Sequence, residues 1–236
     1  MPTRRVDLHN HTPYVYADYH RPEASAEEVV AAAADAGIDV FGATDHFSVA
    51  FCRRLIEVAA WRAAGGGGRV LVLPGAELKV RHGDDEVHLI ALFPPDGSLE
   101  KRFDTLTLML DLPTPVAHVE RLADVVCARD PVEVARAVAT LGGVCHVGHA
   151  DRRFGEYCLV DRPVLGRLAA EPSVSAVEML DPRLAHGRLS SATIIRSSDA
   201  HSPEEIGRRT AELPMPELSF EGLRRALRSE RMSLPA

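Results

Sequence analysis

Residues 25–46 read SAEEVVAAAADAGIDVFGATDH, and this stretch decides the class of fold. Ser25 and Glu28 have the spacing of a capping box, which begins a helix, and Gly37 is the type of residue that follows a helix end. The apolar run from Ile38 to His46 then predicts a buried strand that ends in polar residues. A helix followed at once by a buried strand is the repeating unit of α/β proteins.

The same alternation continues along the chain and predicts an α/β fold with a parallel sheet. About seven such units indicate a closed or nearly closed barrel, with a doubly wound open sheet as the alternative. Residues 94–115 are expected to form a loop with a short helix over one end of the barrel. The predicted strands are residues 5–9, 38–46, 69–78, 86–93, 142–149, 173–180 and 192–201, and the predicted helices are residues 25–37, 51–64, 131–141 and 220–228.

Composition narrows the class of protein further. The 236 residues are 46% hydrophobic and carry a formal net charge of −7, as in an ordinary globular protein without overall attraction for nucleic acid or an anionic membrane. We expect a single domain over residues 1–236. No signal peptide or membrane-spanning run is recognisable, so we expect a cytoplasmic location. The four widely spaced cysteines are predicted to be reduced and buried: Cys52, Cys127, Cys145 and Cys158.

Polar residues of one chemical kind gather where the predicted strands end. Active sites of α/β barrels are built at the carboxyl ends of the strands, so these side chains are expected to converge. Imidazoles and carboxylates without thiolates suit Zn²⁺, Mn²⁺ or Fe²⁺, and their number exceeds the need of one ion, which predicts two or three ions. The residues at strand ends are His9, His11, Asp45, His46, Glu77, His149, Asp199 and His201, and His88 lies within its strand.

Each of these residues also has an ordinary structural interpretation. Asp45 can cap the helix that follows it, Glu77 can be an exposed residue after the turn at Pro74, and Asp199 can be a helix cap. A chain that repeatedly points charged groups inward must compensate them, because buried unpaired charges are costly. The combination therefore favours a metal site.

Five segments taken in order resemble the PHP superfamily, named after its polymerase and histidinol phosphatase members. They read DLHNHT, GATDHFS, PGAEL with VHLIALF, VGHADRRFG and IRSSDAHSPEEIG, and they span residues 7–207. The resemblance implies a distorted (β/α)7 TIM-like barrel that holds up to three divalent ions. The ligands it implies are His9, His11, His46, Glu77 as the bridging carboxylate, His88, His149, Asp199 and His201.

Two ligand positions have competing candidates. The family adds a ligand shortly after H-x-H, and the segment PYVYADYH offers Asp18 and His20, of which Asp18 is favoured. His146 competes with His149, and the Asp-Arg pair that follows His149 matches the family segment better. Three further histidines match no motif and are expected at the surface: His82, His118 and His186.

The resemblance implies a metal-dependent phosphoesterase. A metal-bound hydroxide at a di- or trinuclear site would hydrolyse a phosphomonoester or phosphodiester of a small metabolite or nucleotide, with a short oligonucleotide as a further candidate. Asp199 or His201 is expected to move the proton to the leaving group. Arg152 is suited to bind the substrate phosphate, with a salt bridge to Asp151 as its alternative role. Three residues are candidates for the rim or a supporting layer: Lys79 and Arg81 as cations for phosphate, and Glu178.

Two other functions fit the same motifs less well. An amidohydrolase-like C–N or C–O hydrolase would need a metal-bridging lysine at a strand end, and the chain has only Lys79 and Lys101, neither of them well placed for that role. A non-catalytic, metal-stabilised module that binds a partner protein would be expected to lack several ligands, whereas every motif here retains them.

Overall fold

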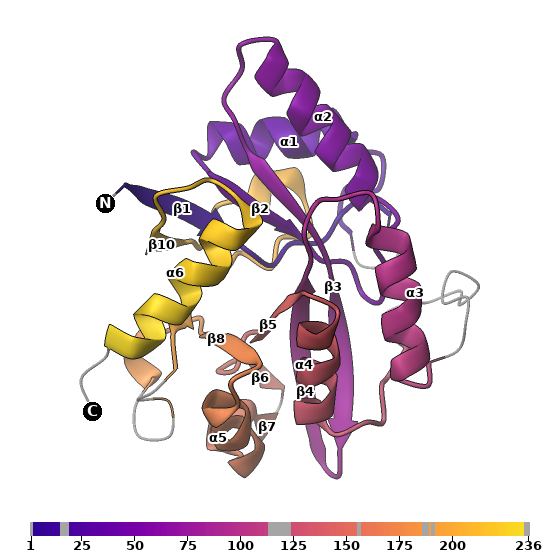
Figure 1. The fold of residues 1–236 in the computed structure, drawn as a ribbon, viewed down its shortest axis with the longest axis vertical. Helices are drawn as coiled ribbons and strands as arrows, with labels where there is room; N and C mark the ends of the chain where they lie inside the picture. Colours follow the sequence, from indigo (N-terminus) through magenta and orange to yellow (C-terminus); the bar gives the residue numbers. More distant parts are fainter. Residues whose placement is uncertain are drawn as a thin grey trace.

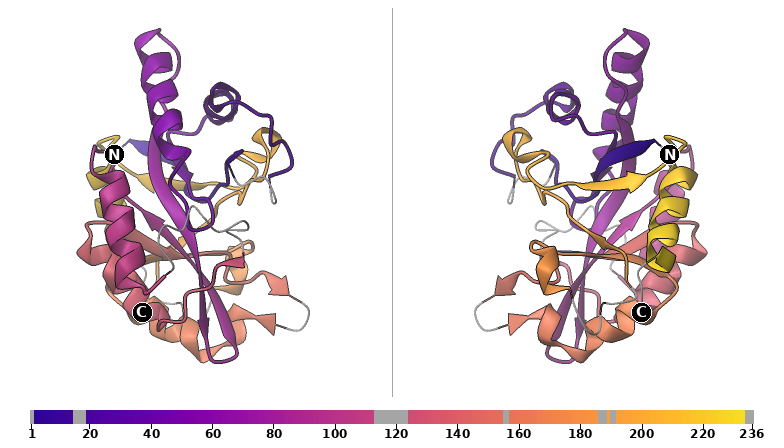
Figure 2. Two further views of the ribbon diagram at one scale, coloured as in Figure 1. Left: turned by 90° about the vertical axis from the view of Figure 1, so that its right-hand side faces the viewer. Right: turned by 90° about the vertical axis from the view of Figure 1, so that its left-hand side faces the viewer.

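A computed structural model describes residues 2–14, 19–112, 124–154, 157–185, 189 and 192–233. Its main sheet has eight strands and curls into a nearly closed barrel with helices on the outside (Figure 1 and Figure 2). In sheet order the strands are β10 (Ala211–Pro214), β1 (Thr3–Asp7), β2 (Val40–Ala43), β3 (Leu71–His82), β4 (Asp85–Leu92), β5 (Val144–Val147), β8 (Val174–Glu178) and β9 (Ile194–Ile195), and β6 (Arg153–Phe154) pairs separately with β7 (Tyr157–Cys158).

The helices begin where the sequence provides caps. Ser25 and Glu28 form the predicted capping box of α1, and Asp130 accepts a hydrogen bond from Val132 N at the start of α4, which has proline at its first turn. The described helices include none long and apolar enough to cross a membrane. They are α1 (Ala26–Asp35), α2 (Cys52–Ala64), α3 (Leu99–Met109), α4 (Pro131–Thr140), α5 (Pro163–Ala170) and α6 (Phe220–Ser233), with 3₁₀ turns at Leu159–Asp161, Pro182–Leu184 and Pro203–Glu205.

The barrel closes where its first and last segments meet. Along its amino-terminal part, β1 pairs antiparallel with β10. Beyond β1, His11 N donates to Ala200 O at 2.9 Å, and Asp199 N donates to His9 O at 2.9 Å. The segment after β9 therefore lies beside the segment after β1, which places residues from the two ends of the chain at one rim.

The predicted barrel is confirmed, and the predicted uniformly parallel sheet is wrong at β4. This strand is antiparallel to both β3 and β5. A tight turn at residues 83–84 joins β3 to β4, and Gly83 takes the positive φ of 61° that such a turn favours. A parallel pair would have required a long crossover between the two strands.

Other elements differ from the prediction in length or number. Most strands stop before the polar residues that were expected to end them, so the candidate site stands largely on the loops that follow. Residues 94–115 contain the eleven-residue helix α3, and no described residue of this segment lines the cavity beside the site. The elements α5, β6, β7 and β10 were not predicted. The four cysteines are buried and free, as expected.

Alternation along the strands produces two apolar layers. Outward-facing side chains pack under the helices in the larger cluster. Inward-facing side chains form a smaller cluster, which the apolar face of α6 covers at the amino-terminal end of the parallel strands. The inner layer includes Val6, Leu8, Val40, Leu73, Ile90, Leu92, Val144, Ala176 and Ile195 from the strands, and Phe220, Leu223 and Leu227 from α6. The carboxyl end of the barrel is thus left for polar groups.

We predict that Gly42→Ala destabilises the barrel between β1 and β2. A Cβ on Gly42 would lie 2.4 Å from Leu8 O, a backbone atom that moves only if the strands separate. Overpacking of this kind costs about 1–3 kcal/mol of unfolding free energy. Urea denaturation measures the change, and Gly68→Ala is the matched control because nothing lies within 4 Å of its added Cβ. Equal midpoints for the two variants would contradict the prediction.

Candidate metal centre

The polar residues of the site lie on the same face of the strands as the inner apolar layer. On β3, Leu73 belongs to that layer and Glu77 follows four residues later, so that alternation directs both side chains inward. On β4, which is antiparallel to β3, Ile90 belongs to the inner apolar layer and His88 lies two residues before it on the same face. Each strand is therefore apolar at one end of the barrel interior and polar at the other.

The carboxylate of Glu77 is the centre of the site. The side chain is only 2% exposed, and five imidazoles from four segments of the chain surround it. Oε2 lies 3.4 Å from His9 Nε2, 3.2 Å from His11 Nε2 and 3.2 Å from His46 Nδ1, whereas Oε1 lies 2.5 Å from His88 Nδ1 and 3.4 Å from His149 Nε2. The exposed turn residue considered from sequence is thus a buried strand residue.

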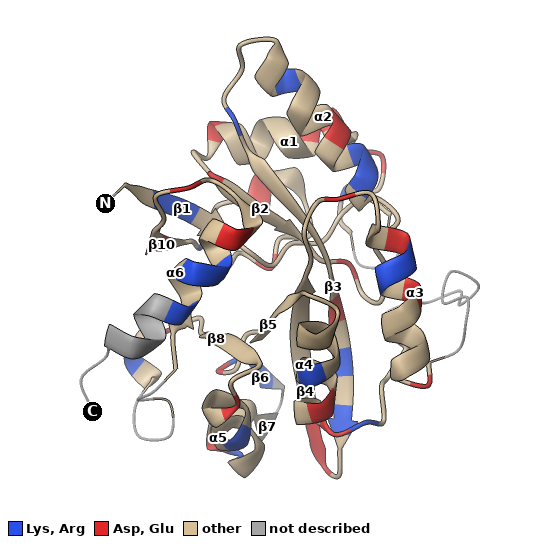
Figure 3. Cartoon of the chain, in the orientation of Figure 1, with Lys and Arg blue, Asp and Glu red and all other residues tan. Residues whose placement is uncertain are grey.

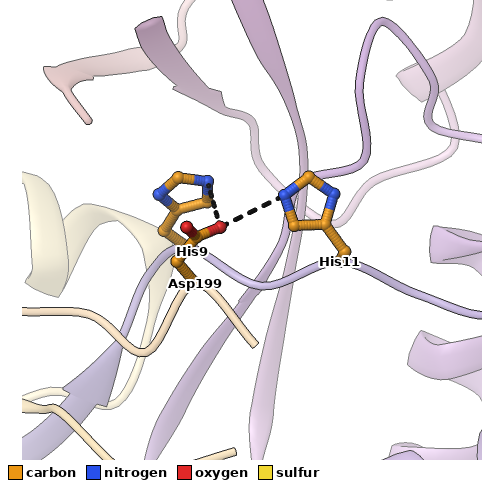
Figure 4. A group of neighbouring side chains, drawn as sticks. All are labelled: His9, His11 and Asp199. Atoms are coloured by element: carbon orange, nitrogen blue, oxygen red, sulfur yellow. Dashed lines mark ion pairs between the residues drawn. The ribbon is translucent and has the colours of Figure 1, made fainter. Parts of the chain in front are cut away.

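Asp199 supplies a second carboxylate on the opposite side of the first two imidazoles. Its Oδ1 lies 3.4 Å from His9 Nε2 and 3.3 Å from His11 Nε2 (Figure 4). Its Oδ2 is paired with Arg152. His9 and His11 therefore lie between the two carboxylates.

The chemistry of these groups fits divalent cations. Three overlapping groups of ligand atoms lie close enough to hold an ion: His9, His11 and Asp199; His9, Glu77 and His149; and His11, His46 and Glu77. Ligand atoms about 2.1 Å from one tetrahedral ion are about 3.4 Å from each other, which agrees with the contacts around His9 and His11. Because the groups share members, the arrangement suits neighbouring ions that share a bridging carboxylate.

Two buried ring nitrogens support this fit. His9 Nε2 and His11 Nε2 are inaccessible to solvent, and neither makes a hydrogen bond within the described part of the chain, although carboxylate oxygens lie near both. Buried polar atoms in native proteins nearly always have a partner. A cation between the rings and the carboxylates would provide one.

The carboxylates of the cluster raise the pKa of the imidazoles beside them. Burial opposes the charged form of His11, but the neighbouring Asp199 and Glu77 raise its pKa to about 9, and for His88 the Glu77 carboxylate outweighs burial to the same extent. Burial would raise the pKa of Glu77, but the charges of His46 and His9 lower it well below its usual range. Because a metal needs the imidazole lone pair, metal binding releases these protons.

Backbone strain is concentrated at the same rim. Among the described residues other than glycine, four have a positive φ, and three of them are Phe47 at 45°, His149 at 24° and Asp199 at 50°. Such conformations cost about 1–3 kcal/mol each and persist where the surroundings enforce them. The strain therefore accompanies candidate ligands that are held by their neighbours.

Two buried aspartates provide that support. Asp7 accepts hydrogen bonds from Ser198 N at 2.9 Å, Ser198 Oγ at 2.6 Å and Gly207 N at 3.0 Å, which hold the segment that carries Asp199. Asp45 accepts from Thr12 N at 2.7 Å and Thr12 Oγ1 at 2.5 Å, and thereby holds the loop after His11. Asp45 does not cap α2, whose N-cap residue makes no side-chain cap bond.

The remaining histidines differ in their relation to the cluster. The His201 ring stacks on His11 with centroids 4.1 Å apart, and its Nδ1 donates to Asp199 O at 2.9 Å, so that Nε2 is the nitrogen not used in this bond. His20 is exposed, with its ring centroid 5.9 Å from that of His201 and outside the three groups of ligand atoms. Asp18 lies outside the described residues, so the choice between Asp18 and His20 stays open.

The competition between His146 and His149 has a geometric answer. His149 reaches the Glu77 carboxylate, whereas His146 lies deeper in the barrel, with Nε2 3.8 Å from Glu178 Oε2. His82 is near the surface and pairs with Asp130 at 3.6 Å, in line with expectation, and His118 and His186 lie outside the described residues.

Arg152 joins the cluster to a cavity of about 330 Å³. It pairs with Asp199 rather than with Asp151, whose carboxylate instead accepts from Leu180 N at 2.6 Å and Asp181 N at 2.8 Å. Of the two predicted rim cations, Lys79 follows Glu77 on the same face of β3, and Arg81 lines the cavity. The cavity is lined by Arg81, Asp84, Asp85, Glu86, His88, Gly148, His149, Arg152 and Leu159.

The described residues thus form a nearly closed barrel with buried histidines and carboxylates at the carboxyl ends of its strands. Residues 193–232 match the family described as PHP-associated. This match and the barrels of the structural relatives confirm the resemblance to the PHP superfamily. No curated protein is significantly similar to the chain in sequence.

Solved structures share the fold at low sequence identity. The lesion-specific endonuclease PfuEndoQ from Pyrococcus furiosus has a TM-score of 0.68 and 16% identity over 97% of this chain, which spans only 56% of that protein. A putative metal-dependent phosphoesterase from Bifidobacterium adolescentis has a TM-score of 0.59 and 16% identity over 94% of both chains. An amidohydrolase from Chromobacterium violaceum, with bound sulfate and no metal, has a TM-score of 0.58 and 18% identity over 95% of this chain and 96% of that one.

We predict that Asp7→Ala destabilises the protein more than Asp39→Ala. The first change leaves the buried donors of Ser198 without their acceptor, which costs about 3 kcal/mol or more. Asp39 on the same side of β1 is half-buried and accepts from Arg5 N at 2.9 Å, so its loss should cost about 1 kcal/mol. Urea denaturation compares them, and an equal or smaller loss for Asp7→Ala would show that the hydrogen bonds to residues 198–207 contribute little.

Proposed function

We propose that this chain is a metal-dependent phosphoesterase formed by a single PHP-type domain over residues 1–236. The observation that carries the proposal is the buried Glu77 carboxylate with its five imidazoles, next to Asp199 and Arg152. The names of two structural relatives, an endonuclease and a putative phosphoesterase, support the same class of reaction.

We assign the site to two or three divalent ions, Mn²⁺, Zn²⁺ or Fe²⁺. When bound, such ions neutralise charge on phosphoryl oxygens and lower the pKa of water. The bridging role falls to Glu77, because both of its oxygens face imidazoles. The residues assigned to hold the ions are His9, His11, His46, Glu77, His88, His149, Asp199 and His201, with Asp18 or His20 as a further candidate.

The chain's own groups bind the ester and move protons. Arg152 extends from the cluster into the cavity, where its guanidinium can hold two oxygens of one phosphate. For His201 the two assigned roles exclude each other, because its Nδ1 donates to Asp199 O and Nε2 alone is left either to hold an ion or to carry the proton for the leaving group. Asp199 is surrounded by two imidazoles and Arg152, which suits it to bind a cation and orient Arg152.

The cavity favours a small substrate over a long polyanion. Its volume of about 330 Å³ is in the lower range of small-molecule sites. Asp84, Asp85 and Glu86 on the β3–β4 hairpin form part of its wall, and Figure 3 shows basic and acidic residues together along this hairpin. We therefore assign a phosphorylated metabolite or nucleotide as the substrate, with a short oligonucleotide as the alternative.

A C–N hydrolase is the second candidate, because one structural relative is named an amidohydrolase. The group that bridges in this site is the Glu77 carboxylate rather than a lysine. Assays with p-nitrophenyl phosphate, bis(p-nitrophenyl) phosphate and an N-acyl amino acid, each with Mn²⁺, separate the candidates. Turnover of the amide alone would overturn the proposal.

We predict that Glu77→Gln removes most of the bound metal. Elemental analysis of the wild-type protein should find two or three ions per chain, and the variant should retain at most one, because a neutral amide cannot bridge two cations. Phosphatase activity should fall by roughly a thousandfold, and chelation of the wild-type protein should abolish it until Mn²⁺ is restored. Glu171→Gln, which changes a carboxylate paired with Arg136 at 2.8 Å, is the control and should keep its metal. A metal-free wild-type protein would refute the metal site.

We predict that Arg152→Lys weakens substrate binding more than catalysis. An ammonium cannot form the two parallel hydrogen bonds of a guanidinium, so KM for p-nitrophenyl phosphate should rise about tenfold with a smaller change in kcat. Arg153→Lys, at the exposed neighbouring position, should leave both constants unchanged. If the two variants behave alike, Arg152 does not bind the phosphate.

A further inference from the structure

Beneath the candidate ligands lies a buried carboxylate that the proposed reaction leaves without a role. Glu178 is the last residue of β8, and its side chain has no solvent exposure. It follows Ala176 of the inner apolar layer by two residues, so it faces the barrel interior just above that layer. His146 on the neighbouring strand β5 is equally buried.

The closest polar contact of this carboxylate is with a candidate ligand. Glu178 Oε2 lies 3.1 Å from His9 Nδ1, and His146 Nε2 is farther from the same oxygen, at 3.8 Å. An ionised carboxylate can only accept hydrogen bonds, so His9 Nδ1 carries the proton and donates it to Glu178. The other nitrogen of His9, Nε2, lies 3.4 Å from an oxygen of Glu77 and 3.4 Å from an oxygen of Asp199, where a bound cation would take its lone pair.

Packing does not explain a carboxylate at this position. Burial of an ionised carboxylate costs several kcal/mol, and an apolar side chain of similar volume would fill the same space. The neighbouring inner-layer residues Ala176 and Val144 are apolar. The charge is therefore placed where it interacts with His9.

We propose that Glu178 is a positioning residue for metal binding. By accepting the Nδ1 proton, it holds His9 in the tautomer and ring orientation that direct Nε2 at a divalent cation. Removal of such outer partners of metal-binding histidines typically weakens metal affinity about 10- to 100-fold. This inference rests on the proposed function, because it requires His9 to bind metal.

Calorimetric titration of metal-free protein with Zn²⁺ tests the inference. We expect Glu178→Gln to bind Zn²⁺ about 10- to 100-fold more weakly than the wild-type protein. Asp39→Asn, which alters a carboxylate at the opposite end of the barrel, is the control and should bind as the wild type does. Wild-type affinity in Glu178→Gln would overturn the positioning role alone. Failure of the wild-type protein to bind Zn²⁺ would instead overturn the proposed function and this inference with it.

A spectroscopic measurement tests the tautomer of His9 directly. In the Zn²⁺-loaded protein, ¹H–¹⁵N correlation of the imidazoles should show a protonated Nδ1 on His9 and no proton on its Nε2. The Nδ1 proton signal should shift in Glu178→Gln and disappear in His9→Ala, which assigns it. A proton on His9 Nε2 would overturn the inference.

Discussion

The structure depends on one constraint, which is the burial of the Glu77 carboxylate. Removal of a carboxylate from water costs several kcal/mol unless opposite charges and hydrogen bonds compensate it. Imidazoles that follow β1, β2 and β5 and one on β4 supply that compensation. Only a sheet that curls back on itself can bring these segments around one side chain. The barrel and the polar cluster therefore depend on each other.

Much of the fold follows from apolar runs in the sequence and from the capping residues and prolines that mark where helices begin. The capping box at Ser25 and the proline at 131 mark helices that the structure contains, and the apolar runs mark seven strands. Strand direction was not predictable in the same way. An apolar run does not indicate whether its strand is parallel or antiparallel to its neighbours, and only the tight turn after His82 reverses β4. The short strands β6, β7 and β10 depend on their partners rather than on local preference.

Much of the candidate site could also be predicted, since its side chains follow apolar runs. Of the support beneath it, only Glu178 was named from the sequence, as a candidate for the rim or a supporting layer, and its partner was not predicted. Asp7 acts through Ser198 and Gly207, and Glu178 acts through His9, so their partners lie far away in the chain. No local pattern marks such contacts. The alternation of side chains along β8 was the available signal, because it places Glu178 on the face that carries the inner apolar layer.

The hairpin of β3 and β4 serves two purposes that can change independently. Its inner part carries Glu77 and His88, whereas its tip forms a wall of the cavity with Arg81, Asp84 and Asp85. The outer part of the hairpin is held by Arg81 N, which donates to Cys127 O at 2.9 Å, and by Arg162, which contacts Asp85 at 2.5 Å, whereas residues 83–84 form only the turn. Mutation or a change of turn length there can alter which molecules enter without disturbing the buried charges. Substrate preference in this protein can thus diverge during evolution while the chemistry stays the same.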